Sequence, residues 1–233
     1  MKALYKKELM QILNSPVGYS VPIVFALFLG YLFIKDVFVV GSASLKPLFS
    51  IAPWFLLILI PALSMRSISE EKRANTFEIL MTLPLSEGTI VLAKLLSLFT
   101  ITAITLALTL SIPLILGLIT TLSIPEIIVG YCGLLLLSLL YLSFSLYIST
   151  RISNQIASFS VSVVALFLVT TLSSDFLANI LPKSIQDILL FGSPLLHLEN
   201  FVKGVIDLRS LSYFIALIIL FYIITIKELQ KRT

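Results

Sequence analysis

The charged residues that could do chemistry gather in one stretch, residues 66–94, which reads RSISEEKRANTFEILMTLPLSEGTIVLAK. Long uncharged runs lie on both sides of it. Charged side chains are costly in hydrocarbon, so we expect this stretch to lie in water. We interpret it as the segment through which a soluble partner acts on a membrane part. Its charged residues are Arg66, Glu70, Glu71, Lys72, Arg73, Glu78, Glu87 and Lys94.

Motifs for catalysis or nucleotide binding are missing from the chain. There is no G-x-x-x-x-G-K-[ST] and no G-x-G-x-x-G, and the nine glycines are scattered. One histidine and one cysteine cannot supply a catalytic set or a metal site. We therefore expect no enzyme activity, no cofactor and no metal in this chain, and we interpret His197 as an interfacial histidine.

The composition and the apolar runs of the chain predict the elements that position the charged stretch. The chain is 58% hydrophobic and only 12% charged, which is typical of an integral membrane protein and far from a soluble domain. Continuous apolar runs near 20 residues predict transmembrane helices, so the fold class is all-α with six transmembrane helices. The expected spans are residues 17–34, 48–65, 94–118, 127–150, 155–172 and 211–226.

Topology follows from the basic residues. An even number of spans puts both termini on one side. With the N-terminus inside, eleven of the 16 basic residues lie inside and five outside. The positive-inside rule therefore predicts N-in and C-in. The net charge of +4 is a topology signal, which argues against nucleic-acid binding.

The chain is expected to form a single transmembrane domain, residues 1–233, with three features besides its spans. Residues 1–14 are predicted to form an amphipathic interfacial helix, with Glu8 on its polar face, that ends before Pro16. The alternative is that the first span begins early. Residues 66–93 form the cytoplasmic segment, and residues 175–210 form an outer region of two short re-entrant helices.

Two helix starts of capping-box type lie in the cytoplasmic segment, at Ser67-x-x-Glu70 and Asn75-x-x-Glu78. The second predicts a short helix at about 76–82, stopped by Pro84. So short a helix is marginal in water and needs a partner surface. It could dock into another protein, or it could pack under its own bundle.

Hydroxyl side chains recur in the third span, where they could line a polar path. The alternative is that they bond back to the carbonyl groups of the preceding turn. They are Thr100, Thr102, Thr105, Thr109 and Ser111. In the fourth span, Gly130 and Gly133 mark a small-residue face.

Residues 61–84, PALSMRSISEEKRANTFEILMTLP, resemble the signature of ABC-2 type permeases, the membrane subunits of ATP-binding cassette transporters. The match is most similar to the gliding-motility-associated branch. HLENFVKGVIDLRSLSYF at 197–214 and SPVGY at 15–19 also resemble that branch.

The resemblance implies a pair of six-span subunits, either a homodimer or a heterodimer, and a coupling helix in the loop between spans two and three. It implies two copies of a separate ATP-binding subunit that carries ATP and Mg²⁺. It also implies the cytoplasmic membrane of a prokaryote and export of a substrate. The residues expected to contact the ATP-binding subunit are Glu70, Glu71, Arg73, Thr76, Phe77, Glu78 and Leu80.

Two other functions stay open at this point. A membrane scaffold or assembly factor would use residues 66–93 to dock a structural partner. A self-sufficient secondary transporter would need charges within its spans for coupling, and the spans carry none near their middles.

Overall fold

The computed structural model describes residues 1–40, 44–74, 76, 85–118, 122–171 and 192–231, and these contain helices and no strand. Five helical stretches are long and apolar enough to cross a membrane. This confirms the all-helical membrane class. The stretches are Pro16–Lys35, Lys46–Arg73, Glu87–Gly117, Ile124–Arg151 and Leu208–Gln230.

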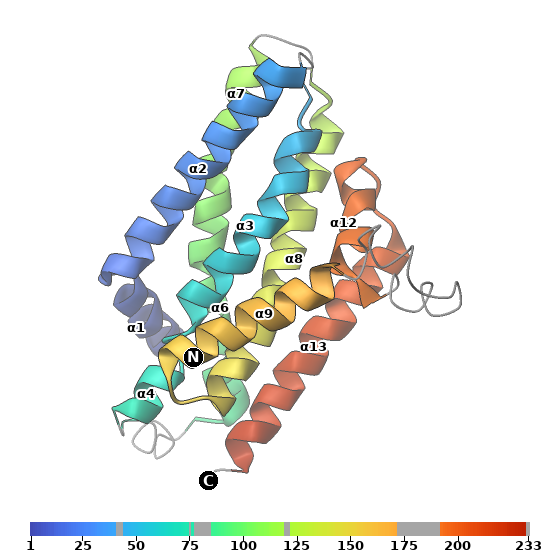
Figure 1. Cartoon of the computed structure of the whole chain (residues 1–233). Coiled ribbons are helices and arrows are strands. Elements are labelled where there is room, and N and C mark those ends of the chain that lie inside the picture. The colour runs from blue at the N-terminus through green and yellow to red at the C-terminus, as the bar shows by residue number, and fades with distance from the viewer. Residues whose placement is uncertain (41–43, 75, 77–84, 119–121, 172–191, 232–233) are drawn as a thin grey trace.

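The long helices stand side by side, and the chain's two termini lie at the same end of the bundle (Figure 1). That end also holds helix α4 and the turn between α8 and α9. We call it the terminal end. The opposite end holds the end of α2 and the beginnings of α3 and α8. Termini at one end agree with an even number of crossings.

The N-terminal helix is separate, as predicted: α1 spans Lys2–Leu13 and α2 spans Pro16–Val40. Ser15 joins them, since its hydroxyl donates to the Ile12 carbonyl (2.7 Å) and accepts from the Gly18 amide (3.1 Å). The predicted faces of α1 were wrong at one residue. Glu8 is buried and points into the bundle, because a carboxylate can be buried where a cation meets it.

Helices α3 (Lys46–Ser64) and α8 (Ile124–Arg151) form the centre of the bundle. Gly130 allows their close approach, since a Cβ there would lie 2.5 Å from the Phe49 ring. Gly133 does the same for α12 (Pro194–Val202), because its Cβ would lie 2.6 Å from the Phe201 Cβ. The predicted small-residue face of α8 is therefore a packing face.

The predicted third span, 94–118, corresponds to two consecutive helices. Helix α6 spans Glu87–Thr109 and α7 spans Ser111–Gly117. The helix begins early because Ser86 caps it, with the Ser86 hydroxyl accepting from the Thr89 amide (3.4 Å). The break follows from Pro113, which has no amide to continue the hydrogen-bond ladder. Lys94 therefore lies inside a helix and not at its start.

The predicted fifth span corresponds to α9, Gln155–Thr171, which is apolar but has only 17 residues. It lies obliquely to the other helices (Figure 1). Its role as a sixth crossing stays a prediction. The last span is α13, Leu208–Gln230. A short helix, α12, lies where one of the two re-entrant helices is predicted, and its entry into the membrane stays a prediction. The other predicted helix falls at 172–191, outside the described residues.

Candidate functional site

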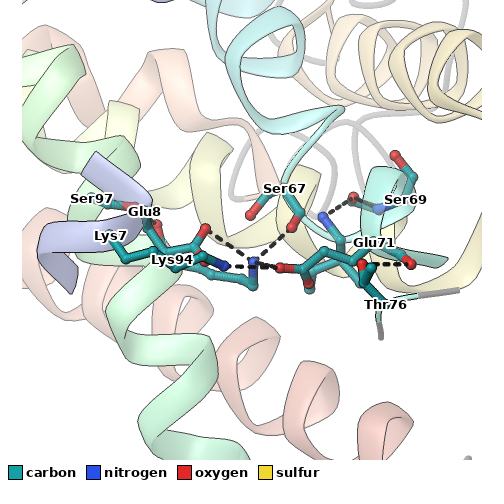
Figure 2. Close-up of polar contacts among 10 residues, drawn as sticks. Lys7, Glu8, Ser67, Ser69, Glu71, Thr76, Lys94 and Ser97 are labelled. Carbon is teal, nitrogen blue, oxygen red and sulfur yellow. Dashed lines mark hydrogen bonds and ion pairs between the residues drawn. The ribbon is translucent and has the colours of Figure 1, made fainter. Parts of the chain in front are cut away.

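Lys94 of α6 is the centre of a buried ionic cluster at the terminal end of the bundle. Only 1% of its side chain is exposed. Its ammonium group donates to Glu8 Oε2 (3.0 Å), Glu71 Oε1 (2.8 Å) and the Ser67 carbonyl (2.8 Å). Figure 2 shows the Lys94 nitrogen between these three oxygens. A lysine has three donors, so the ammonium group is fully satisfied.

Helix α1 supplies Glu8 because it packs against the first turns of α6. Leu4 lies against Ile90 and Ala93 in a small apolar cluster. Two turns beyond Ala93 on α6, the Tyr5 hydroxyl lies 2.8 Å from Thr100 Oγ1. These contacts turn the Leu4 and Glu8 face of α1 toward α6, and the carboxylate reaches Lys94.

Helix α4 (Ser69–Arg73) supplies Glu71 and is held by the end of α8. The Ile68 and Ser69 amides donate to Ser149 Oγ at 3.3 Å and 3.1 Å. Free amides at a helix start need such an acceptor. The predicted cap from Ser67 was wrong, because α4 begins at Ser69 and no side chain of its own segment caps it.

A second bond ties α4 to α8, since the Lys72 ammonium donates to the Thr150 carbonyl. The segment after α3 is therefore attached on one side to α6 and α1, and on the other to α8. A five-residue helix has little stability of its own. Its geometry must come from these attachments.

Charge in the cluster balances. Lys7, which is largely exposed, lies 3.2 Å from Glu8 Oε1 and 4.0 Å from Glu71 Oε1. Two carboxylates thus face two ammonium groups. An unpaired charge at this depth would cost several kcal/mol, so the cluster holds its members together. In the described part of the chain, Glu71 Oε2 is buried and has no hydrogen-bond partner.

Four of the seven predicted contact residues lie in the described part of the chain. Glu70 is half-buried, and Arg73 and Thr76 are exposed. Glu71 is turned inward to Lys94, while Thr76 donates to the Glu71 carbonyl through its amide (3.0 Å). Phe77, Glu78 and Leu80 lie outside the described residues.

A cavity of about 140 Å³ opens beside the cluster, between α1, the start of α2 and the segment after α3. Glu8 and Gln11 line it from one side, and Arg66 and Glu70 from the other. Polar groups of both the N-terminal helix and the charged segment therefore share one solvent-accessible space. Glu8 touches both the cavity and Lys94.

A contact between Lys94 and Glu8 was not predicted from the sequence. Two signals could have found them. Ser86 followed by Glu87 is a helix start, which places Lys94 within the second turn of an apolar helix. Glu8 follows Leu4 at helical spacing, which places it on the same face. Their meeting across 86 residues of sequence had no local signal.

The hydroxyls of the predicted third span, which lie on α6 and α7, make local bonds, as the alternative interpretation held. Thr102 Oγ1 donates to the Leu98 carbonyl (3.0 Å) and Thr105 Oγ1 to the Ile101 carbonyl (2.8 Å). The other three also donate to a carbonyl of the preceding turn. Such bonds satisfy a hydroxyl within one helix, so no polar path is needed to explain them.

His197, which was predicted to be an interfacial histidine, is buried on α12, and its depth in the membrane stays a prediction. Its ring stacks on Tyr213 with centroids 4.0 Å apart, and its Nδ1 lies 3.3 Å from Ser210 Oγ. These contacts join α12 to α13. Among the described residues no group of His, Cys, Asp and Glu could hold a metal ion.

A family model described as "ABC-2 family transporter protein" matches residues 3–227. A search of curated proteins found no match.

Proposed function

The chain belongs to the ABC-2 transporter family, and we propose that it moves a substrate across the cytoplasmic membrane with ATP hydrolysed by a separate subunit. The direction we propose is export. Family membership makes the chain a membrane permease component of an ATP-binding cassette transporter. Energy must then reach its spans from a partner.

The buried Lys94 cluster is the observation that carries this proposal. It joins the segment after α3 to α1 and α6 through charged hydrogen bonds of 2.8–3.0 Å. Force applied to α4 by a partner would pass to both helices, because breaking a buried ion pair is strongly unfavourable. Ser149 and Lys72 carry the same movement to α8.

The partner we propose is an ATP-binding subunit in two copies, which binds the ATP and Mg²⁺. It would contact the exposed residues around α4, of which Arg73 and Thr76 belong to the described part. A second permease subunit, identical or related, would complete the complex. The exposed apolar side chains of α2, such as Leu27 and Tyr31, support a partner within the membrane. The family branch we propose is the gliding-motility-associated one.

Glu71→Gln tests the coupling in the complex of the tagged chain with its co-purifying ATPase. The substitution removes the carboxylate charge that faces Lys94. It should leave the complex intact but reduce the permease-dependent change in ATP hydrolysis about tenfold, which is within the usual range of coupling energies. Arg73→Ala should instead weaken co-purification. Glu126→Gln, an exposed residue at the opposite end of the bundle, is the matched control and should change neither.

Two results would contradict the proposal. One is an ATPase whose rate is the same with and without the chain. The other is a chain that co-purifies only with proteins that do not hydrolyse ATP, which would support a membrane scaffold.

A further inference from the structure

A groove of about 390 Å³ lies between α3 and α12 at the end of the bundle opposite to the termini. Helix α3 lines it with Lys46, Ser50 and Trp54, which recur at every fourth residue. Helix α12 and the residue after it line the other wall with Leu195, Glu199 and Lys203, at the same spacing. Residues four apart share one helix face, so each helix presents a continuous wall.

The two lysines lie at the same mouth of the groove. Gly204, which follows Lys203, lies close to Glu126 in the first turn of α8, since a Cβ on Gly204 would be 3.3 Å from the Glu126 Cγ. Lys203 is therefore near the start of α8. Beyond Lys46, Phe49 packs on Gly130, one turn further along α8. The helices are therefore antiparallel along the groove. Trp54 and Leu195 lie eight residues from the lysines, about 12 Å deeper at 1.5 Å per residue.

The groove stays open because α12 rests on α8 rather than on α3. The missing side chain of Gly133 lets Phe201 and Leu198 approach α8 closely. On the α3 wall the position between Lys46 and Trp54 is the small Ser50, whose hydroxyl donates to its own Pro47 carbonyl (2.9 Å). Neither wall fills the space between them.

The charged residues that line the groove are two lysines and one glutamate. Lys203 lies 3.4 Å from Glu199 in an exposed pair, which is weak. Lys46 is exposed and makes no ion pair in the described part of the chain. A cationic mouth at the membrane surface above an apolar, aromatic floor matches an anionic headgroup with an acyl chain beneath it.

We propose that this groove binds a phospholipid with an anionic headgroup from the leaflet at that end of the bundle. The phosphate and its net negative charge lie at Lys46 and Lys203, and one acyl chain runs down to Trp54 and Leu195. A second copy of the chain would fit poorly if it docked through the same surface, because Lys46 and Lys203 would then face the same two lysines of the other copy and repel them. The proposal does not depend on transport.

Trp54 is the only tryptophan in the chain and lines the groove, so its fluorescence reports occupancy. The full chain is reconstituted in phosphatidylcholine vesicles with increasing amounts of lipid brominated on its acyl chains. Brominated phosphatidylglycerol should quench Trp54 with an apparent affinity about fivefold higher than brominated phosphatidylcholine, as one net cationic side chain at an anionic surface predicts. The double variant Lys46→Gln/Lys203→Gln should lose this preference.

Lys35→Gln is the matched control. It removes an exposed lysine of α2 outside the groove, and the headgroup preference should remain. Ser50→Phe keeps both lysines but fills the groove, and it should lower quenching by both lipids. Helix content by circular dichroism checks that each variant is folded. Equal quenching by both lipids in the unmodified chain, or a preference that survives the double substitution, would overturn the proposal.

Discussion

At the scale of single residues, Lys94 is the group on which the proposed function depends. A lysine with 1% exposure is stable in its charged form only because two carboxylates and a carbonyl surround it. Glu8 and Glu71 depend on Lys94 in turn, since each would otherwise be a buried anion. The three side chains act as one unit, although they come from three helices.

Lys94→Met should destabilise the folded chain by about 3 kcal/mol or more, because it removes the buried cation and leaves the two carboxylates with only the largely exposed Lys7. Unfolding in mixed detergent micelles measures the change. The triple variant Lys94→Met/Glu8→Gln/Glu71→Gln should recover most of the loss, since it removes the charges together. Lys7→Gln is the control, because its partly exposed pairs should contribute within about 1 kcal/mol. Equal stability of Lys94→Met and the unmodified chain would mean that the cluster is not a structural unit.

At the scale of elements, α4 is a helix whose position is set by other elements. Its five residues cannot form a stable helix alone. Ser149 of α8 accepts from its first amides, and Lys94 of α6 binds its Glu71. A segment built this way moves with the helices that hold it, which is what a coupling element requires.

Ser149→Ala should loosen α4 without disturbing α8. Loss of a helix N-cap costs about 1 kcal/mol, which corresponds to roughly fivefold faster amide exchange. Hydrogen exchange followed by mass spectrometry should show this increase at residues 68–74. Ser143→Ala is the matched control on the same helix, because within the described residues the Ser143 hydroxyl bonds only the Leu140 carbonyl (2.8 Å). Similar exchange in Ser149→Ala and Ser143→Ala would show that Ser149 does not hold α4.

At the scale of the whole molecule, the features proposed for energy transfer and for lipid binding lie at opposite ends. The termini and α4 occupy the terminal end (Figure 1), and Lys94 lies there because it binds Glu71 of α4. The groove between α3 and α12 opens at the other end. The long, mostly apolar helices lie between the end proposed for an aqueous partner and the end proposed for a lipid.

Cysteine labelling in cells tests the proposed orientation. In a Cys132→Ala background, cysteines replacing Lys6 or Lys231 should react with a membrane-impermeant maleimide only after permeabilisation. A cysteine replacing Ser123, which is exposed at the start of α8, should react in intact cells. The reverse pattern would place the termini outside and would contradict the positive-inside argument.

Sequence alone determined the membrane class, the existence of five apolar helices long enough to cross a membrane, the separate N-terminal helix and the family. These depend on hydropathy, helix breakers and a contiguous motif, all of which are local along the chain. Tertiary structure decided which face of α1 is buried, that Lys94 of α6 meets Glu8 of α1, and that Ser149 caps α4. It also decided that Lys46 and Lys203 share a groove. Such pairings join residues far apart in the chain, and their energy exists only once the helices have packed.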